Sequence, residues 1–283
     1  MLLDKPPGVT SARAVARVKR LLPNKTKVGH TGTLDPLASG LLVLLIGRST
    51  RLSRYVTGLD KAYTATARFG AVSDTLDAEG EISPLRTPMP GEAEIHATLP
   101  TLTGEILQVP PMVSALKRGG VRLYDLHRRG VTVEREPRPV TIHTFDLLAL
   151  DPEEQTATFE VACSSGTYVR TLISDLAERL GTGAYLTTLR RTRVGDLPLQ
   201  EATPPENLNR VTLYNHIIQP SRVVAHLPRV EVGEERELAV RSGRALPAQG
   251  LRGSFRVERE GALLAVYRDG AGGARAEVVL CGR

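Results

Sequence analysis

The chain has 283 residues, of which 41% are hydrophobic and 24% charged, and its 37 Lys and Arg against 31 Asp and Glu give a net charge of +6. This hydrophobic fraction is enough for a packed core, which excludes a wholly disordered chain. The longest apolar run, residues 41–46, is far shorter than the roughly 20 residues that a membrane-spanning helix needs. Asp4, Pro6 and Pro7 interrupt the stretch in which a secretory signal is apolar, so we expect a cytoplasmic protein without a membrane partner.

The positive charge is concentrated in three segments. Residues 1–60 hold ten Lys and Arg against three acids, residues 110–145 seven against three, and residues 165–195 five against two. If these segments meet in the fold, they form a positive surface suited to a polyanion; if they stay apart, they are ordinary solvated faces. Charge alone does not choose between these alternatives. The low aromatic content, 4% with no Trp, argues against an extended base-stacking platform.

The first predicted elements are a helix and a buried strand. Thr10 or Ser11 can cap a helix that runs to about Leu22, with apolar residues on one face and Lys and Arg on the other. The apolar run 41–46 is short and bounded by glycines, which predicts a buried strand rather than a helix.

Three more elements follow in the next sixty residues. Apolar residues spaced at i, i+3, i+4 and i+7 predict a helix over 52–59 that ends near Gly58. Alternating apolar and polar residues over 63–69 predict a half-buried strand. Residues 95–102 predict a short helix that Pro100 interrupts.

Beyond residue 110 the pattern changes twice. Residues 110–140 carry four prolines and little periodicity, which indicates a long, basic, mobile loop with some local structure. Alternation over 157–163 predicts a strand, and the apolar spacing over 172–180 predicts a helix closed by Gly181. From about residue 226 the chain is punctuated by glycines, which predicts a small all-β module. Its strands are expected around residues 230–232, 238–240, 255–257, 263–267 and 276–280.

Asp35 lies in a glycine-rich segment, residues 29–40, that cannot form a stable regular element. It precedes Pro36, which favours an extended and exposed conformation. A carboxylate on a rigid turn before a buried strand is well placed to act on a substrate. Taken alone, however, this acid favours a structural interpretation, since Asp-Pro is common in turns and caps.

Tyr63 and Arg170 are the other candidates for chemistry. Tyr63 at a strand start can present its ring to a planar ligand, although such a residue is more often a half-buried side chain with a hydrogen-bonded tip. Arg170 near a helix start opposes the helix dipole unless an anion is close. That anion can be a phosphate or a carboxylate such as Asp35. The structural alternative is a surface arginine that pairs with Asp175 or Glu178.

Signatures of other cofactor chemistry are missing from the sequence. It has no P-loop, no GxGxxG after a strand and no HxxxH spacing among its six histidines. Cys163 and Cys281 are too far apart in sequence for a CxxC pair. We therefore expect a mechanism that uses no metal and no nucleotide or other cofactor.

Several blocks of the sequence occur in a fixed order: residues 4–11, 29–36, 61–63 with 69–70, 74–80, 104–106, 110–117, 166–172 and 189–192. Together these ordered motifs resemble one family, the bacterial TruB family of tRNA pseudouridine-55 synthases. The resemblance implies an α+β fold: a pseudouridine-synthase-like catalytic domain, residues 1–225, on a largely antiparallel sheet with flanking helices. It also implies that residues 226–283 form an all-β, PUA-like RNA-binding domain.

The activity that this resemblance implies is isomerisation of a flipped-out uridine in the tRNA T-arm stem-loop, by a monomeric enzyme without cofactor. Asp35 would be the essential residue, acting on the sugar, on the base, or as acceptor of a sugar proton. Tyr63 would stack on the target base and assist its final proton loss, and Arg170 would pair with Asp35 and keep it ionised. Segment 110–140 would close over the RNA arm.

The resemblance also implies a set of RNA-binding residues. His30 would enter the T-loop in the space left by the extruded nucleotide, whose unstacking costs a few kcal/mol. The other members of the set are Lys5, Thr31, Gly32, Lys117, Tyr168 and Arg191.

Two other classes of function stay open on the sequence. One is a non-catalytic tRNA-binding or tRNA-folding protein, against which the three intact catalytic candidates argue. The other is a pseudouridine synthase that acts on another RNA, since a fold does not name its substrate. A carboxylate-dependent glycosidase is disfavoured because no second acid lies in a comparable motif.

Overall fold

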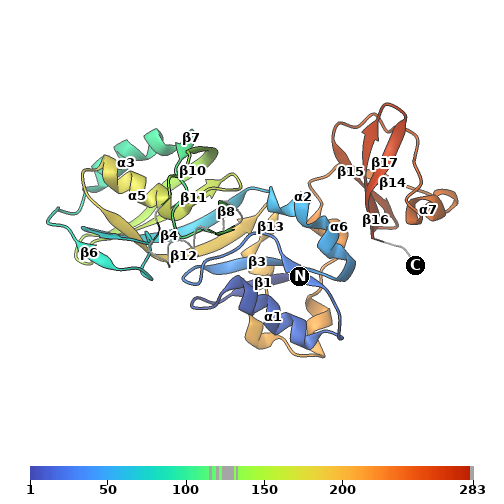
Figure 1. The fold of residues 1–283 in the computed structure, drawn as a ribbon, viewed down its shortest axis with the longest axis horizontal. Coiled ribbons are helices and arrows are strands. Elements are labelled where there is room, and N and C mark those ends of the chain that lie inside the picture. The colour runs from blue at the N-terminus through green and yellow to red at the C-terminus, as the bar shows by residue number, and fades with distance from the viewer. Residues whose placement is uncertain (115–116, 119–120, 123–130, 132, 281–283) are drawn as a thin grey trace. The chain divides into compact units, whose positions relative to one another are not determined.

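The computed structural model describes residues 1–114, 117–118, 121–122, 131 and 133–280, which form a mixed α+β fold (Figure 1). The described residues divide into two compact units. The first unit comprises Met1–Leu34, Gly40–Leu59 and the chain from Arg193 on, and the second comprises Asp35–Ser39 and Asp60–Thr192.

The first unit begins with a small antiparallel arrangement next to a helix. Strand β1 (Leu2–Lys5) pairs with β3 (Ser39–Ile46), and β2 (Val28–His30) also pairs with β3. Helix α1 (Ser11–Leu21) starts where predicted, because the Thr10 side chain accepts the Arg13 N–H as an N-cap. The predicted buried strand is confirmed: the side chains of residues 41–45 in β3 are almost fully buried.

The helix predicted over residues 52–59 is confirmed, and a 3₁₀ helix precedes it. A 3₁₀ helix, η1 (Gly47–Leu52), leads into α2 (Ser53–Thr57), whose C-cap is Gly58. After residue 193 this unit contains short elements only. They are β13 (Leu197–Pro198), η3 (Leu199–Glu201), η4 (Pro205–Asn207), η5 (Thr212–His216) and α6 (Pro220–Val223).

The second unit is built on a largely antiparallel sheet, in the strand order β12-β4-β11-β10-β7. Its strands are β4 (Lys61–Phe69), β7 (Gly104–Gln108), β10 (Arg138–Asp151), β11 (Thr156–Cys163) and β12 (Ala184–Val194). The alternation predicted over 63–69 and 157–163 is confirmed in β4 and β11, where Ala65 and Phe159 are fully buried. A hairpin of β5 (Ala71–Ser73) and β6 (Ile82–Pro84) follows β4.

Helices of this unit also follow the sequence pattern. Helix α3 (Glu92–Thr98) passes into the 3₁₀ helix η2 (Leu99–Leu102), the change that Pro100 predicts. Helix α5 (Val169–Arg179) packs against β4 and buries Leu172, Ile173 and Leu176 completely. It ends at Arg179 with Leu180 as its C-cap, and the φ of +72° at the following Gly181 turns the chain so that the Thr182 N–H donates to the Ala177 carbonyl (3.0 Å).

Part of the predicted mobile loop of residues 110–140, namely residues 115–116, 119–120, 123–130 and 132, lies outside the described residues. Within that range β8 (Lys117–Arg118) pairs antiparallel with β9 (Val121–Arg122). The segment also ends earlier than predicted, since β10 already begins at Arg138 and pairs there with β7.

A separate four-stranded sheet closes the chain, as expected for a small C-terminal β module. Its strands are β14 (Arg229–Glu231), β15 (Ser254–Arg259), β16 (Ala262–Gly270) and β17 (Gly273–Val279). The strand predicted at 238–240 is wrong, because these residues belong to helix α7 (Glu234–Arg241). Three glutamates in the first turn and Arg241 in the last turn complement the helix dipole. Only Val240 is buried, whereas Leu238 is 78% exposed.

The C-terminal sheet shares a hydrophobic core with the rest of the first unit. Its Val266 and Val278 belong to one cluster of buried side chains with Leu41, Val43 and Val56. Polar contacts add to this core: the Tyr55 hydroxyl donates to the Glu277 carboxylate (2.9 Å), and Arg51 donates to the Val279 carbonyl (3.0 Å). Among the described residues, no helix combines the length and the apolar character that crossing a membrane requires.

Candidate active site

A buried arginine at the start of α5 organises the candidate site. Arg170 is the second residue of the helix and its side chain is only 3% exposed. Tyr168, the N-cap, makes no side-chain capping bond, and the first turn contains no acid. A guanidinium at this position opposes the helix dipole, so the sequence requires an anion close to it.

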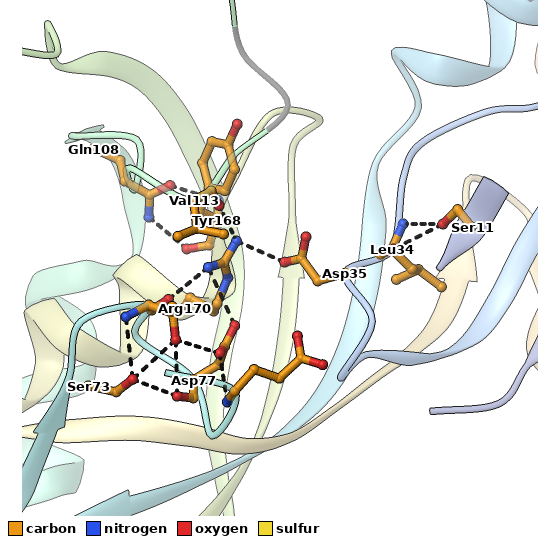
Figure 2. Close-up of polar contacts among 11 residues, drawn as sticks. Ser11, Leu34, Asp35, Ser73, Asp77, Gln108, Val113, Tyr168 and Arg170 are labelled. Atoms are coloured by element: carbon orange, nitrogen blue, oxygen red, sulfur yellow. Dashed lines mark hydrogen bonds and ion pairs between the residues drawn. The ribbon is translucent and has the colours of Figure 1, made fainter. Parts of the chain in front are cut away.

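Two carboxylates supply that anion (Figure 2). Arg170 Nη2 lies 2.9 Å from Asp35 Oδ2, and Nη1 lies 3.4 Å from Asp77 Oδ2. The same nitrogens donate to the carbonyls of Thr75 and Val113, each at 2.7 Å. The guanidinium is therefore held in a fixed plane. Arg170 pairs with Asp35 and Asp77, and not with Asp175 or Glu178 as in the structural alternative.

Asp77 is a residue of this cluster for which the sequence predicted no role. Its side chain is 3% exposed, and Oδ1 accepts the Thr75 hydroxyl (2.7 Å) and the Glu79 N–H (3.0 Å). Ser73 completes the turn by donating to the Asp77 carbonyl (2.6 Å). The only sequence signal was the position of Asp77 in the 74–80 block, because an acid in a polar turn is normally exposed.

Asp35 lies on a turn that hydrogen bonds hold at both ends. The preceding Leu34 exchanges two hydrogen bonds with the Ser11 hydroxyl, both 2.9 Å, through its N–H and its carbonyl. The Ala38 N–H donates to the Asp35 carbonyl at 3.1 Å and closes a turn with Pro36 in its second position. The Asp35 side chain is 40% exposed, so it is accessible as well as paired with Arg170.

Tyr63 is on β4, in the same unit as Asp35 and Arg170, and is 8% exposed. Burial raises the pKa of the Tyr63 hydroxyl, and the hydrogen bond and charge of Arg191 oppose that rise. Arg191 is itself 1% exposed. Burial and the charge of Arg191 lower the pKa of the neighbouring Lys61 ammonium to about 8. The phenol of Tyr63 is thus neutral near pH 7 and lies next to cationic side chains.

Tyr168 is positioned by a glutamine that the sequence analysis did not select. The Tyr168 N–H donates to Gln108 Oε1 (2.7 Å), and Gln108 Nε2 donates to the Tyr168 carbonyl (3.1 Å). Gln108 ends β7 and is 2% exposed. Burial raises the pKa of the Tyr168 hydroxyl above its ordinary value, and a hydrogen bond with Ser114 opposes part of that rise.

Of the remaining predicted residues, four belong to the first unit: Lys5, His30, Thr31 and Gly32. Lys5 is fully buried, and its ammonium donates to the carbonyls of Pro6 (2.9 Å) and Val9 (2.6 Å). His30 ends β2, Thr31 donates its N–H to the Val43 carbonyl (3.1 Å), and Gly32 has a φ of +97°. The side chain of Lys117 lies outside the described residues.

Comparison with known families gives two matches along the chain. The TruB family pseudouridylate synthase model (N-terminal domain) matches residues 19–169, and the tRNA pseudouridylate synthase B C-terminal domain model matches residues 170–234.

Individual relatives agree with these family matches. A tRNA pseudouridine synthase B of Aromatoleum aromaticum is 46% identical over 93% of this chain and 86% of its own length. A protein of the same name from Heliobacterium modesticaldum is 44% identical over 88% of this chain and 81% of its own.

Solved structures share the fold. The chain matches one in a Cbf5-Nop10-Gar1 complex with a TM-score of 0.74 and 26% identity, over 99% of this chain and 84% of the other. A second match, with a TM-score of 0.73 and 23% identity over 98% and 83%, is to an H/ACA RNP bound to a substrate RNA containing 2′-deoxyuridine.

Proposed function

Because the chain belongs to the TruB family of pseudouridylate synthases, we propose that it converts a uridine in the T-arm loop of tRNA, at position 55, to pseudouridine. The observation that carries this proposal is the accessible Asp35 carboxylate, 2.9 Å from the buried guanidinium of Arg170. An acid that is held by an arginine and still reaches solvent can act on a ligand.

The reaction moves atoms only within one nucleotide. The bond between N1 of the base and C1′ of the sugar breaks, the base rotates, a bond forms between C5 and C1′, and the proton on C5 leaves while N1 gains one. Product and substrate have the same composition, so no oxidant and no second substrate is needed. Asp35 acts in its ionised form, by attack on the sugar, by attack on the base, or by removing a sugar proton, and the pair with Arg170 favours that form.

We assign the base-facing role to Tyr63. Burial keeps the phenol of Tyr63 neutral. In the proposed role its ring stacks on the uracil, and its hydroxyl assists the loss of the C5 proton. Arg191 hydrogen-bonds Tyr63 and is buried, so we assign Arg191 to holding that ring in the RNA-binding site.

For the RNA loop we propose a set of binding residues: His30, Thr31, Gly32, Tyr168 and Lys117. The buried ammonium of Lys5 stabilises the segment before α1 through Pro6 and Val9, and so supports RNA binding from inside the fold.

Basic side chains of the first unit support binding of a polyanion. A hollow of about 700 Å³ is lined by Lys25, Lys27, Arg48, Arg51 and Arg241, and no acid is among its described lining residues. Such a cluster attracts phosphates without regard to sequence, and its contribution falls as salt rises. Arg241 is contributed by the C-terminal module, so we propose that residues 226–283 take part in RNA binding. We further propose that the enzyme acts as a monomer in the cytoplasm.

The test is incubation of the purified chain with an unmodified tRNA transcript, without added cofactor, followed by mapping of pseudouridine. We expect one new pseudouridine in the T-loop and none when that uridine is replaced by cytidine. Product at another position or only in another RNA would overturn the assignment of the substrate. Binding of tRNA without any product would favour a tRNA-folding protein instead.

A further inference from the structure

The side-chain amide of Gln108 is bonded to the residue from which helix α5 starts. Gln108 Oε1 accepts the Tyr168 N–H (2.7 Å), and Gln108 Nε2 donates to the Tyr168 carbonyl (3.1 Å) (Figure 2). The same carbonyl accepts the Leu172 N–H (3.0 Å), which is the first hydrogen bond inside the helix. The Tyr168 side chain itself makes no capping bond. The Gln108 amide therefore fixes the backbone at the point where the helix begins.

Gln108 is itself firmly placed. It is 2% exposed and is the last residue of β7, where its backbone pairs with Arg138 of β10. A glutamine amide carries an acceptor and a donor side by side, which is what pairing with the N–H and the carbonyl of one residue requires. The contact thus links a strand of the sheet to the start of α5, 60 residues further along the chain.

The segment after Gln108 also contacts the far end of the Arg170 side chain. Arg170 is two residues after Tyr168, so its backbone lies in the helix turn that Gln108 holds. Five residues after Gln108, the Val113 carbonyl accepts Arg170 Nη2 at 2.7 Å. Two consecutive buried prolines lie between these contacts, and proline restricts the backbone. One short and stiff segment therefore holds both the start of the helix and the guanidinium of Arg170.

We propose that Gln108 is a positioning residue for the reaction: its amide sets where helix α5 begins and thereby places the Arg170 guanidinium against the Asp35 carboxylate. The proposal rests on the proposed function, since Asp35 must act on a uridine for the position of Arg170 to matter. Arg170 Nη2 lies 2.9 Å from Asp35 Oδ2, so a small shift of the helix start lengthens this contact. A displacement of about 1 Å can slow a reaction about 100-fold.

The test is a double-variant cycle on kcat. Gln108→Met keeps an unbranched side chain of similar length and removes the donor and the acceptor, and Gln108→Asn shortens the amide by one carbon. Each change is made in the parent and in Arg170→Met, because a residue that acts through Arg170 has nothing to position once the guanidinium is gone.

Thr87→Val is the matched control. It removes the hydrogen bond between the Thr87 and Thr182 hydroxyls (2.6 Å), which lies just beyond the other end of α5. Each protein is measured for kcat and KM on a tRNA transcript, for tRNA affinity and for melting temperature. The kinetic measurements are made at a temperature at which every variant is folded.

We expect both Gln108 variants to lower kcat about 3- to 10-fold in the parent, since the loss cannot exceed that of removing the Arg170 guanidinium. In Arg170→Met the same changes should lower kcat by less than about twofold. KM and tRNA affinity should stay close to those of the parent, because phosphate contacts, which the buried Gln108 does not make, supply much of the affinity for RNA. The Gln108 variants and Thr87→Val should lower the melting temperature by about 2–4 °C, but Thr87→Val should leave kcat unchanged.

Equal losses of kcat in the parent and in Arg170→Met would overturn the proposal, because Gln108 would then not act through Arg170. A rise in KM that accounts for the loss would also overturn it, since Gln108 would then serve RNA binding through Tyr168. So would an equal loss of kcat in Thr87→Val, which would trace the effect to stability. If the parent itself makes no pseudouridine, the proposed function fails and this role with it. If the parent is active and the Gln108 variants equal it, only the role of Gln108 fails.

Discussion

Replacing Arg170 by methionine should lower both stability and activity, for two separable reasons. Methionine keeps an unbranched apolar side chain in place of the aliphatic stem of arginine but removes the charge and the donors of the guanidinium. Asp77, 3% exposed, then keeps a negative charge without its cation. Removing one partner of a buried ion pair costs about 3–5 kcal/mol, and most of this cost comes from the charge that remains buried.

The second effect of Arg170→Met is on Asp35. A hydrogen bond to a charged group is worth about 1.5–3 kcal/mol when buried. Because the Asp35 side chain is 40% exposed, solvent screening reduces this value, and we take about 1.4–2 kcal/mol. That loss corresponds to a 10- to 30-fold fall in kcat/KM.

The double variant Arg170→Met/Asp77→Asn separates the two effects. Asparagine at 77 carries no charge, so the double variant should regain about 2 kcal/mol of the lost free energy of unfolding. It should not regain activity, because Asp35 still lacks its arginine. Urea unfolding and pseudouridine formation on a tRNA transcript measure the two quantities. Recovery of activity together with stability would refute the reasoning, since Arg170 would then act only through the fold.

Three further predictions follow from particular side chains. Asp35→Asn should abolish pseudouridine formation while tRNA affinity, measured by filter binding, persists; turnover by this variant would remove Asp35 from its role. Burial, and then the charge of Glu178, raise the pKa of Asp175 to about 6, so its ionisation lowers stability as pH rises from about 4 to 6. Asp175→Asn should therefore raise the free energy of unfolding at pH 7 by about 1–2 kcal/mol and leave stability at pH 4 unchanged, and equal gains at both pH values would contradict this cause. Removing residues 227–283 should lower solubility as well as RNA affinity, because Val266 and Val278 leave a shared core; a truncated chain with an unchanged melting temperature would show that the module is independent.

The sequence alone predicted the elements whose signals are local. The cap at Thr10, the apolar run of β3, the alternation in β4 and the apolar spacing of α5 each depend on residues a few positions apart. The same kind of reasoning failed at α7, because two apolar residues at i and i+2 fit a strand as well as a helix turn. In the structure these residues form a helix: the glutamates of the first turn complement its dipole, and Leu238 is exposed rather than packed in a sheet.

For the site, the sequence predicted that Arg170 needs an anion, and only the tertiary structure decided which anions it has. Arg170 is bound to Thr75 and Val113, which lie 95 and 57 residues away in sequence. The burial of Asp77 depends on how the turn after β5 packs under that guanidinium, a contact that no local pattern encodes. Helix and strand signals are short-range, whereas the placement of a buried charge is a balance of desolvation and long-range pairing that exists only in the folded chain.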